Sequence, residues 1–290
     1  MGVIDRQARD LPLDAHVHTD LSPDSDVPID AYASQALERG IAEIAITDHV
    51  DFEPGTPAYA FTTFAQRERV VREAADRWAD RGVAIRFGVE ITWDRRWADH
   101  IREHLARHDY DFIIGSVHVY ADSPYAPGNV RGWVHGRPLA EVIRPYFEDV
   151  EAAARSGLFD ALGHLDFVKR YLVPHVTPDE LARAPELYEP ILRALVDSGT
   201  ILEVNTSGLR QAANETYPSA AIVARYRELG GRSVTVGSDA HRADAFAWGL
   251  ADGYEIGAAA GFSSLAFRRG GDRVEVDMAA SPNVAAGRSL

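Results

Sequence analysis

Six of the eleven histidines in this 290-residue chain stand at the ends of short apolar runs, each beside a carboxylate or a small residue. They lie in Asp14–His18, Thr47–His49, Gly115–His118, Gly163–Asp166 and Gly237–His241, and a sixth run, Gly88–Glu90, ends in a carboxylate. Neutral imidazole is the commonest metal ligand in proteins, and a carboxylate can neutralise clustered cations. Ligands from six separate run ends therefore predict one multinuclear metal site.

The position of each candidate ligand within its run supports this interpretation. A single histidine at the end of a strand is most often structural. Here, however, every candidate falls at the C-terminal end, and in a parallel barrel those ends meet at one rim. Residues two apart on a strand share a face, so His16 with His18, and Asp239 with His241, can chelate jointly.

Short β-type runs alternate with amphipathic helical segments, which is typical of parallel βαβ units. The expected strands are Leu11–Ala15, Ala42–Thr47, Ala84–Ile91, Phe112–Val117, Phe159–Gly163, Ile201–Val204 and Ser233–Gly237. The expected helices are Ile29–Arg39, Phe64–Arg81, Leu139–Ser156, Pro178–Ser198 and Ala220–Leu229. Several end at a glycine, the usual left-handed cap. Seven strands are one fewer than the common eightfold α/β barrel has.

Composition narrows the classes of partner and of metal ligand. The net charge is −14 and no basic stripe is present, so nucleic acid is not an expected partner. A small anionic substrate is still compatible, because a metal cluster makes the local field positive. The chain has no cysteine, so His, Asp and Glu must supply the ligands, and these suit Zn, Mn or Fe(II).

We expect one cytoplasmic domain over residues 1–290. The N-terminal segment Met1–Leu11 is polar, and no stretch approaches the ~18 apolar residues of a membrane helix, so no membrane partner is expected. No linker or internal repeat divides the chain. The core is expected to span about 11–268, with a flexible tail from about 281.

The motifs taken together, in their order along the chain, indicate a protein family more specifically than any one motif alone. HxH, TDH, GVE, GSVH, GHLD, EVNTSG and GSDAH together resemble the PHP (polymerase and histidinol phosphatase) superfamily over residues of about 11–260. DAHVHTDLSPDS, EVNTSGLR and GSDAHR are most similar to its histidinol-phosphate phosphatases. The resemblance implies an α/β fold, a distorted seven-stranded (β/α) barrel, with three divalent metal ions.

The resemblance also implies a ligand set for each metal. The first metal would take His16, His18, Glu90 and Asp239. The second would take Glu90 as a bridge, with His118 and His164. The third would take Asp24, His49 and His241. Many family members have histidine in the slot of Asp24, which here could equally cap the approach to a helix.

The implied activity is metal-dependent hydrolysis of a phosphomonoester, L-histidinol phosphate in histidine biosynthesis. Multinuclear sites lower the pKa of a bound water and neutralise phosphoryl oxygens, so we expect a metal-bridging hydroxide to attack phosphorus in line. Asp48, beside a ligand but not assigned to a metal, is the candidate general acid for the leaving alkoxide. Alternatively, Asp48 orients a liganding imidazole.

Other side chains can bind the phosphate. Arg170 and Arg210 follow the appropriate strand ends, and guanidinium geometry suits a phosphate dianion. Each could instead form a surface salt bridge, and Lys169 could replace Arg170. Ser116 and Ser207 are expected to add neutral donors.

Five further histidines lie away from strand ends. His100, His104 and His108 repeat every four residues, a chelating spacing, but arginines interleave with them, so we interpret the set as a solvated helix face. His135 lies in a long loop and contacts substrate or is an ordinary loop residue. His175, after a proline, is expected to be structural.

Two alternatives to histidinol phosphatase follow from the same motifs. Another phosphoesterase, acting on a different small ester or a nucleotide, would favour an extended basic groove, which this acidic chain lacks. A metal-bearing accessory domain without turnover is the other, although the ligand set is nearly complete.

A cationic substrate amine would need a carboxylate or an aromatic face. The available residues are Asp51, Glu53, Trp93 and Trp133.

Overall fold

The computed structural model describes residues 11–269 and 272–278, and the expected flexible tail from about 281 lies outside them. The strands within this part of the chain are β1 (Leu13–Val17), β2 (Glu43–Ile46), β3 (His49–Val50), β4 (Ala84–Thr92), β5 (Phe112–Ser116), β6 (Ala161–Leu162), β7 (Ile201–Asn205), β8 (Val234–Gly237), β9 (Ser264–Arg269) and β10 (Asp272–Asp277). All seven predicted strands are present, with ends shifted by up to two residues.

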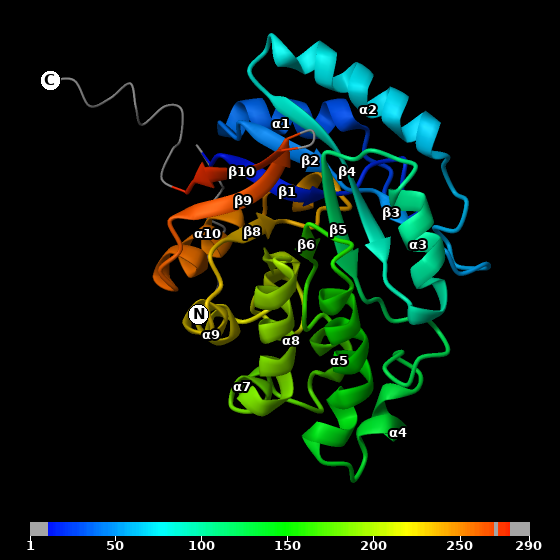
Figure 1. The fold of residues 1–290 in the computed structure, drawn as a ribbon, viewed down its shortest axis with the longest axis vertical. Helices are drawn as coiled ribbons and strands as arrows, with labels where there is room; N and C mark the ends of the chain where they lie inside the picture. Colours follow the sequence, from blue (N-terminus) through cyan, green and yellow to red (C-terminus); the bar gives the residue numbers. More distant parts are fainter. Residues whose placement is uncertain (1–10, 270–271, 279–290) are drawn as a thin grey trace, which may run out of the picture.

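The helices surround these strands in Figure 1. They are α1 (Ile29–Arg39), α2 (Phe64–Ala79), α3 (Ala98–Leu105), α4 (Val130–Val134), α5 (Leu139–Ser156), α6 (Lys169–Leu172), α7 (Pro178–Ala182), α8 (Pro185–Ser198), α9 (Ala220–Glu228) and α10 (Leu250–Ala259). The expected glycine caps are present after α5 and α8, where Gly157 and Gly199 have φ of 65° and 75°. Only glycine adopts that region without strain.

The prediction of one helix over residues 178–198 was wrong. The segment forms α7 and α8, separated at Arg183 and Ala184. Pro185 cannot donate a backbone hydrogen bond into a preceding turn, so it is accommodated at the start of a new helix. Thr177 and Glu180 form a capping box that fixes the start of α7.

The parallel sheet runs in the order β1, β2, β4, β5, β6, β7 and β8. The two ends of this order meet, because Asp239 N donates to His16 O at 2.8 Å and His18 N donates to Ala240 O at 2.9 Å. These bonds close the barrel at the rim formed by the carboxyl ends of the strands. The fold is therefore the predicted distorted α/β barrel, with a mostly parallel sheet.

The distortion lies at the opposite end of β1. There β9 pairs with β8 through Val234 and Leu265, and β10 pairs with β9 in antiparallel register. The side chain of Tyr254, from α10, bonds both backbone groups of Leu13, accepting from its N–H at 3.1 Å and donating to its carbonyl at 2.8 Å. The Tyr254 side chain thus satisfies the backbone groups of Leu13 on the edge of β1 that does not pair with β2.

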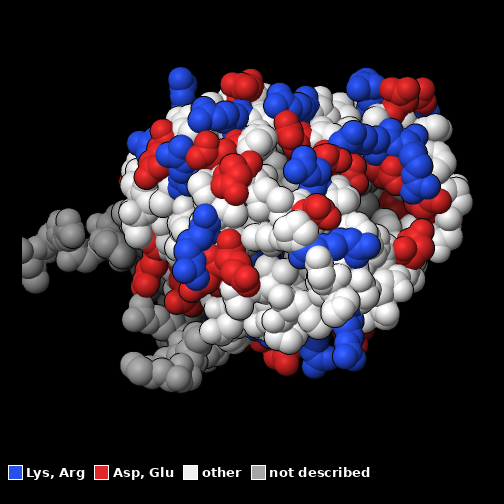
Figure 2. All heavy atoms as spheres, turned by 90° about the horizontal axis from the view of Figure 1, so that it is seen from below, with Lys and Arg blue, Asp and Glu red and all other residues white. Residues whose placement is uncertain are grey.

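The strands expected from the sequence did not include β9 and β10. Their hairpin is placed by packing, since Phe267 lies with its ring centroid 4.7 Å from that of Phe112 in β5. On the face seen in Figure 2, acidic and basic side chains intermingle. No helix among the described residues is long and apolar enough to span a membrane.

Replacing Gly237 with alanine should destabilise the barrel seam. A Cβ there would lie 2.3 Å from His16 Cβ and 3.1 Å from the His16 nitrogen, so β1 and β8 would have to separate. We expect the free energy of unfolding to fall by about 1–3 kcal/mol in urea denaturation. Gly132→Ala is the control, because nothing lies within 4 Å of the position that its new methyl group would take. Equal stability of the two variants would contradict this steric explanation.

Candidate metal centre

The nine predicted ligands lie together at the closed rim of the barrel. Three overlapping groups have potential ligand atoms within 4.8 Å of one another: His18, His49 and His241; His16, His18 and Asp239; His49, Glu90 and His118. The remaining two ligands join through neighbours. His164 Nε2 is 2.9 Å from Glu90 Oε1, and Asp24 Oδ2 is 3.1 Å from His241 Nε2.

Glu90 occupies the centre of the cluster and is fully buried. Its Oε2 lies 2.9 Å from His49 Nδ1, 3.4 Å from His16 Nε2 and 3.5 Å from His18 Nε2. Its Oε1 lies 2.9 Å from His164 Nε2 and 3.5 Å from His118 Nε2. A carboxylate with different imidazoles facing each oxygen is suited to bridge two cations, as the resemblance of the motifs implies.

The hydrogen bonding of His16 leaves one ring nitrogen free for a metal. Its Nδ1 lies 2.6 Å from Glu203 Oε1, so the carboxylate holds the proton at Nδ1. The Nε2 lone pair then faces His18 Nε2 at 2.9 Å. Glu90 Oε2 accepts no well-aligned hydrogen bond although it is buried. Facing lone pairs and an unsatisfied anionic oxygen fit a divalent cation.

The electrostatics of the cluster also favour the binding of positive charge. Burial lowers the pKa of His16, but the carboxylates of Glu203, Glu90 and Asp239 outweigh burial and raise that pKa well above its ordinary value. Burial raises the pKa of Glu90, yet the facing histidines lower it well below its usual range. Carboxylates that stay ionised inside a protein need cationic partners, either protons on histidine or metal ions.

Asp24 faces the imidazoles rather than a helix end. Its Oδ2 is 3.2 Å from His49 Nε2 and 3.1 Å from His241 Nε2. The N-cap of α1 is Pro28, and no side chain caps that helix. Of the two roles considered for Asp24, the contacts favour that of a ligand at the exposed edge of the cluster.

His118 is oriented through a hydroxyl relay that the sequence pattern did not indicate. Its Nδ1 is 2.9 Å from Thr92 Oγ1, and Thr92 Oγ1 donates to Asp51 Oδ1 at 2.5 Å. Because the threonine hydrogen goes to Asp51, Nδ1–H of His118 donates to Thr92 and Nε2 is left for a metal. Thr92 lies two residues after Glu90 on β4, so strand alternation places both on one face.

Asp239 is held by the polar residues of β7 and the segment after it. Asn205 Nδ2 donates to Asp239 Oδ2 at 3.2 Å and to Glu203 Oε2 at 3.1 Å. Ser207 Oγ lies 2.6 Å from Asn205 Oδ1 and 3.2 Å from Asp239 Oδ2. Ser207, predicted to contact phosphate, thus contacts a metal-ligand candidate. The alternating spacing of Glu203, Asn205 and Ser207 was the available signal for this layer.

Asp48 is buried behind the cluster. Its Oδ1 accepts from Thr19 N at 2.6 Å, and its Oδ2 accepts from Thr19 Oγ1 at 2.9 Å. Burial raises the pKa of Asp48 to about 6, although the hydrogen bonds from Thr19 act in the opposite direction. Its carboxylate therefore fixes the segment after β1.

The candidate phosphate-binding side chains have distinct surroundings. Arg210 is half-buried and donates to the carbonyls of Ser238 at 3.1 Å and Asp239 at 3.3 Å. Arg170 is exposed, with its guanidinium carbon 5.7 Å from the Phe167 ring centre. Ser116 Oγ is buried without a hydrogen-bond partner, a placement that does not favour contact with substrate.

Lys169 and two of the remaining histidines have structural surroundings. Lys169 is buried and pairs with Asp166 at 2.7 Å and with Glu215, so its ammonium group is already neutralised. The interpretation of His100, His104 and His108 as a solvated face was wrong for two of them. His104 Nε2 is 2.9 Å from the hydroxyl of Tyr110, and His108 stacks on Phe64 at 4.1 Å.

His104 on α3 and His108, three residues after the end of α3, are half-buried beside Phe64 at the start of α2, whereas His100 is exposed. His135 and His175 are exposed in loops. None of these five histidines belongs to a group of potential ligands among the described residues. The metal-binding chemistry is therefore concentrated at the barrel rim within that part of the chain.

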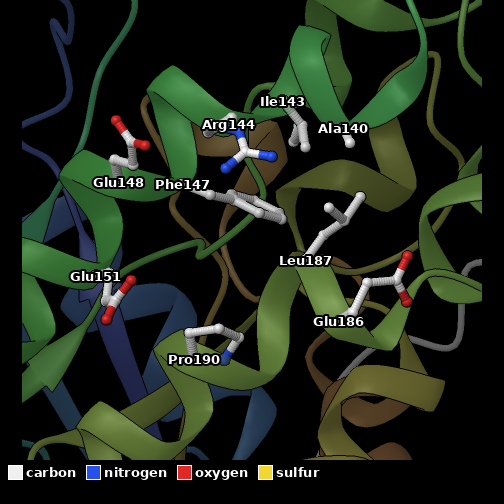
Figure 3. A pocket seen from close by; sticks show the side chains of 9 residues that line it. All are labelled: Ala140, Ile143, Arg144, Phe147, Glu148, Glu151, Glu186, Leu187 and Pro190. Carbon is white, nitrogen blue, oxygen red and sulfur yellow. The ribbon is translucent and has the colours of Figure 1, made fainter.

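A cavity of about 240 Å³ opens beside the cluster. Its lining residues are Pro23, Asp24, His49, Asp51, Pro57, Ala58, Thr92, His118, Val119 and Tyr120. A different cavity, of about 330 Å³, lies between α5 and α8. Figure 3 shows Phe147 and Leu187 between the two helices and Arg144 beside them. That second cavity contains no residue of the metal cluster.

Comparison with known proteins places this geometry in a family. The sequence pattern of the PHP domain matches residues 14–207, which extend from β1 to just beyond β7 and contain all the predicted ligands except Asp239 and His241. The chain belongs to the PHP domain family. The fold and the clustering of nine candidate ligands thus agree with the resemblance of the motifs.

Relatives with assigned activities are phosphatases. The chain is 31% identical over 242 residues to a probable histidinol-phosphatase of Deinococcus radiodurans, covering 82% of this chain and 90% of that protein. It is 28% identical over 233 residues to a probable phosphatase of Vibrio vulnificus, covering 80% of this chain and 78% of that protein.

A solved structure shows the ligands of a similar protein. Histidinol phosphate phosphatase from Lactococcus lactis, complexed with zinc, L-histidinol and phosphate, superposes with a TM-score of 0.78. The sequences are 25% identical, and the match covers 91% of this chain and 98% of that one. This PHP protein is accordingly a metal-dependent phosphatase of the histidinol-phosphatase type, and its buried His, Asp and Glu clusters are consistent with a multi-metal site.

Replacing Glu90 with alanine should remove more than one equivalent of metal. The carboxylate faces imidazoles of more than one predicted metal position, so its loss weakens two positions together. Metal content is measured by mass spectrometry after reconstitution with zinc and removal of excess. Glu103→Ala, an exposed carboxylate on α3, is the control and should keep the full content. Full metal retention in Glu90→Ala would refute the bridging assignment.

Proposed function

We propose that this protein hydrolyses L-histidinol phosphate to L-histidinol and phosphate, a step of histidine biosynthesis. The observation that carries the proposal is the nine-residue cluster beside a small cavity. Support comes from the similarity to a phosphatase solved with zinc, L-histidinol and phosphate. The cavity of about 240 Å³ suits a small ester rather than a polymer.

The residues of the cluster are proposed to hold three divalent ions, of Zn, Mn or Fe. Such ions lower the pKa of a coordinated water, which supplies the nucleophile, and neutralise the phosphoryl oxygens. The chain contributes the geometry: Glu203 fixes the tautomer of His16, and Thr92 fixes that of His118. Fixed donors reduce the reorganisation needed during the reaction.

Further residues are proposed to act on the phosphate and on the leaving group. Arg170 and Arg210 would neutralise the phosphate dianion, because both carry guanidinium groups on segments that follow strands of the rim. Asp48 would protonate the leaving alkoxide, and its raised pKa of about 6 supports that role. The alternative role for Asp48 is to anchor Thr19, since both of its oxygens accept hydrogen bonds from that residue.

A second candidate function is hydrolysis of another small phosphate ester, which the similarity to a probable phosphatase of Vibrio vulnificus favours. A nucleotide or oligonucleotide substrate would gain from a basic surface around the site. The cavity beside the cluster instead has no lysine or arginine among its lining residues. The deciding experiment assays metal-reconstituted protein with histidinol phosphate, sugar phosphates and nucleotides, and a preference for either of the latter would refute the first proposal.

Substitution of Asp48 by asparagine should impair alkyl esters selectively. If Asp48 protonates the leaving group, kcat for histidinol phosphate should fall by ~10²–10⁴-fold. A nitrophenyl ester should lose much less, because its leaving group needs no proton. Thr19→Val serves as the comparison. Equal losses for both esters, reproduced by Thr19→Val, would assign Asp48 to support of the site.

Substitution of Arg210 by alanine should weaken hydrolysis of both esters to the same extent, since each presents the same dianion. Loss of a charge-assisted contact predicts a fall in kcat/KM of about 10- to 100-fold. Arg242→Ala, which removes an exposed arginine paired with Asp244, is the control. Metal content must be measured in parallel, because Arg210 also contacts the carbonyl of Asp239. Normal kinetics would exclude a role for Arg210 in phosphate binding.

A further inference from the structure

The cavity beside the metal cluster contains two carboxylates and no lysine or arginine among its lining residues. The carboxylate of Asp24 faces His49 and His241 and belongs to the proposed ligand set. Asp51 is the other carboxylate, and it lies outside that set. The cavity therefore presents one acidic group that the proposed binding of metal does not use directly.

The charge of Asp51 lacks a cationic partner among the described residues. Only 9% of the residue is exposed. Its Oδ1 accepts from the hydroxyl of Thr92 at 2.5 Å, and its Oδ2 accepts from the hydroxyl of Tyr120 at 3.3 Å. Both donors are neutral. A nearly buried carboxylate whose hydrogen-bond partners are neutral hydroxyls is suited to bind a cation from outside the chain.

The other groups considered for a substrate amine are engaged elsewhere. Glu53 accepts from Trp97 Nε1 at 2.8 Å and pairs with Arg96 at 2.8 Å. Trp93 is buried with its ring edge-on to another aromatic ring, and Trp133 donates its indole N–H to a carbonyl on α5. None of the three lines the cavity. The structure thus distinguishes Asp51 from these alternatives.

We propose that Asp51 binds the ammonium group of an amino-alcohol phosphate and makes the enzyme selective for cationic leaving groups. This inference rests on the proposed function. A single hydroxyl, that of Thr92, joins Asp51 to His118, so the acidic group lies next to the metal centre. In histidinol phosphate two carbon atoms separate the ester oxygen from the amine, and this short spacing requires adjacent sites for phosphate and ammonium.

The test compares two substrates in Asp51→Asn. The ratio of kcat/KM for L-histidinol phosphate to that for glycerol 1-phosphate, an ester whose alcohol part carries no charge, should fall by roughly 10- to 100-fold, the effect of losing one charge-assisted contact. Binding of L-histidinol to zinc-loaded protein, measured by titration calorimetry, should weaken by a similar factor. Metal content is determined for each variant.

Two control variants separate recognition from support of the metal centre. Glu53→Gln removes a neighbouring carboxylate outside the cavity and should keep the wild-type ratio. Thr92→Val interrupts the relay to His118 but keeps the charge of Asp51, so both esters should be affected alike and the ratio should be kept. A fall in the ratio confined to Asp51→Asn would support the inference.

Three contrary outcomes are distinguishable. A wild-type protein that prefers histidinol phosphate, combined with an unchanged ratio in Asp51→Asn, would overturn the role of Asp51 and leave the proposed function standing. Loss of metal in Asp51→Asn, with equal losses for both esters, would identify Asp51 as a support of His118 and overturn the inference. A wild-type protein without preference for the amino-alcohol ester would overturn both.

Discussion

The buried carboxylate of Glu90 is the interaction on which the rest of the site depends. A fully buried anion is costly, and here five imidazoles from four segments of the chain converge on its two oxygens. Those imidazoles can reach one point only if β1, β4 and the segments after β2, β5 and β6 end at the same rim. The parallel barrel provides that convergence, and the cluster in turn requires metal ions or protons to balance its charge.

The strands and the clustering of the ligands could be predicted from sequence because a single physical rule governs both. Parallel strands place their carboxyl ends together, so His16, Glu90 and His118 could be assigned to one rim without coordinates. The supporting layer was not predicted. Glu203, Thr92 and Asp51 act through hydrogen bonds whose partners are distant in sequence, and no local pattern specifies which polar residue meets which imidazole.

Contacts between residues distant in sequence also explain two other differences between the prediction and the structure. The hairpin of β9 and β10 was not predicted, although Gly270-Gly271 between two alternating runs is a hairpin signal. Its place in the fold is set by packing such as that of Phe267 on Phe112. His104 and His108 look polar in sequence, but the fold gives them Tyr110 and Phe64 as partners. Tertiary contacts, rather than residue type, decide burial in each case.

The bonds that close the barrel are made by the backbone of the metal-ligand candidates themselves: His18 donates to Ala240, and Asp239 donates to His16. Closure of the cylinder and occupation of the site are consequently linked. Any ion that binds only the closed form stabilises the seam in proportion to the logarithm of its concentration. The exchange rates of the amide hydrogens at the seam then report the supply of metal. Exchange is slow when ions are abundant, and these amides are the first to exchange when a chelator removes the ions.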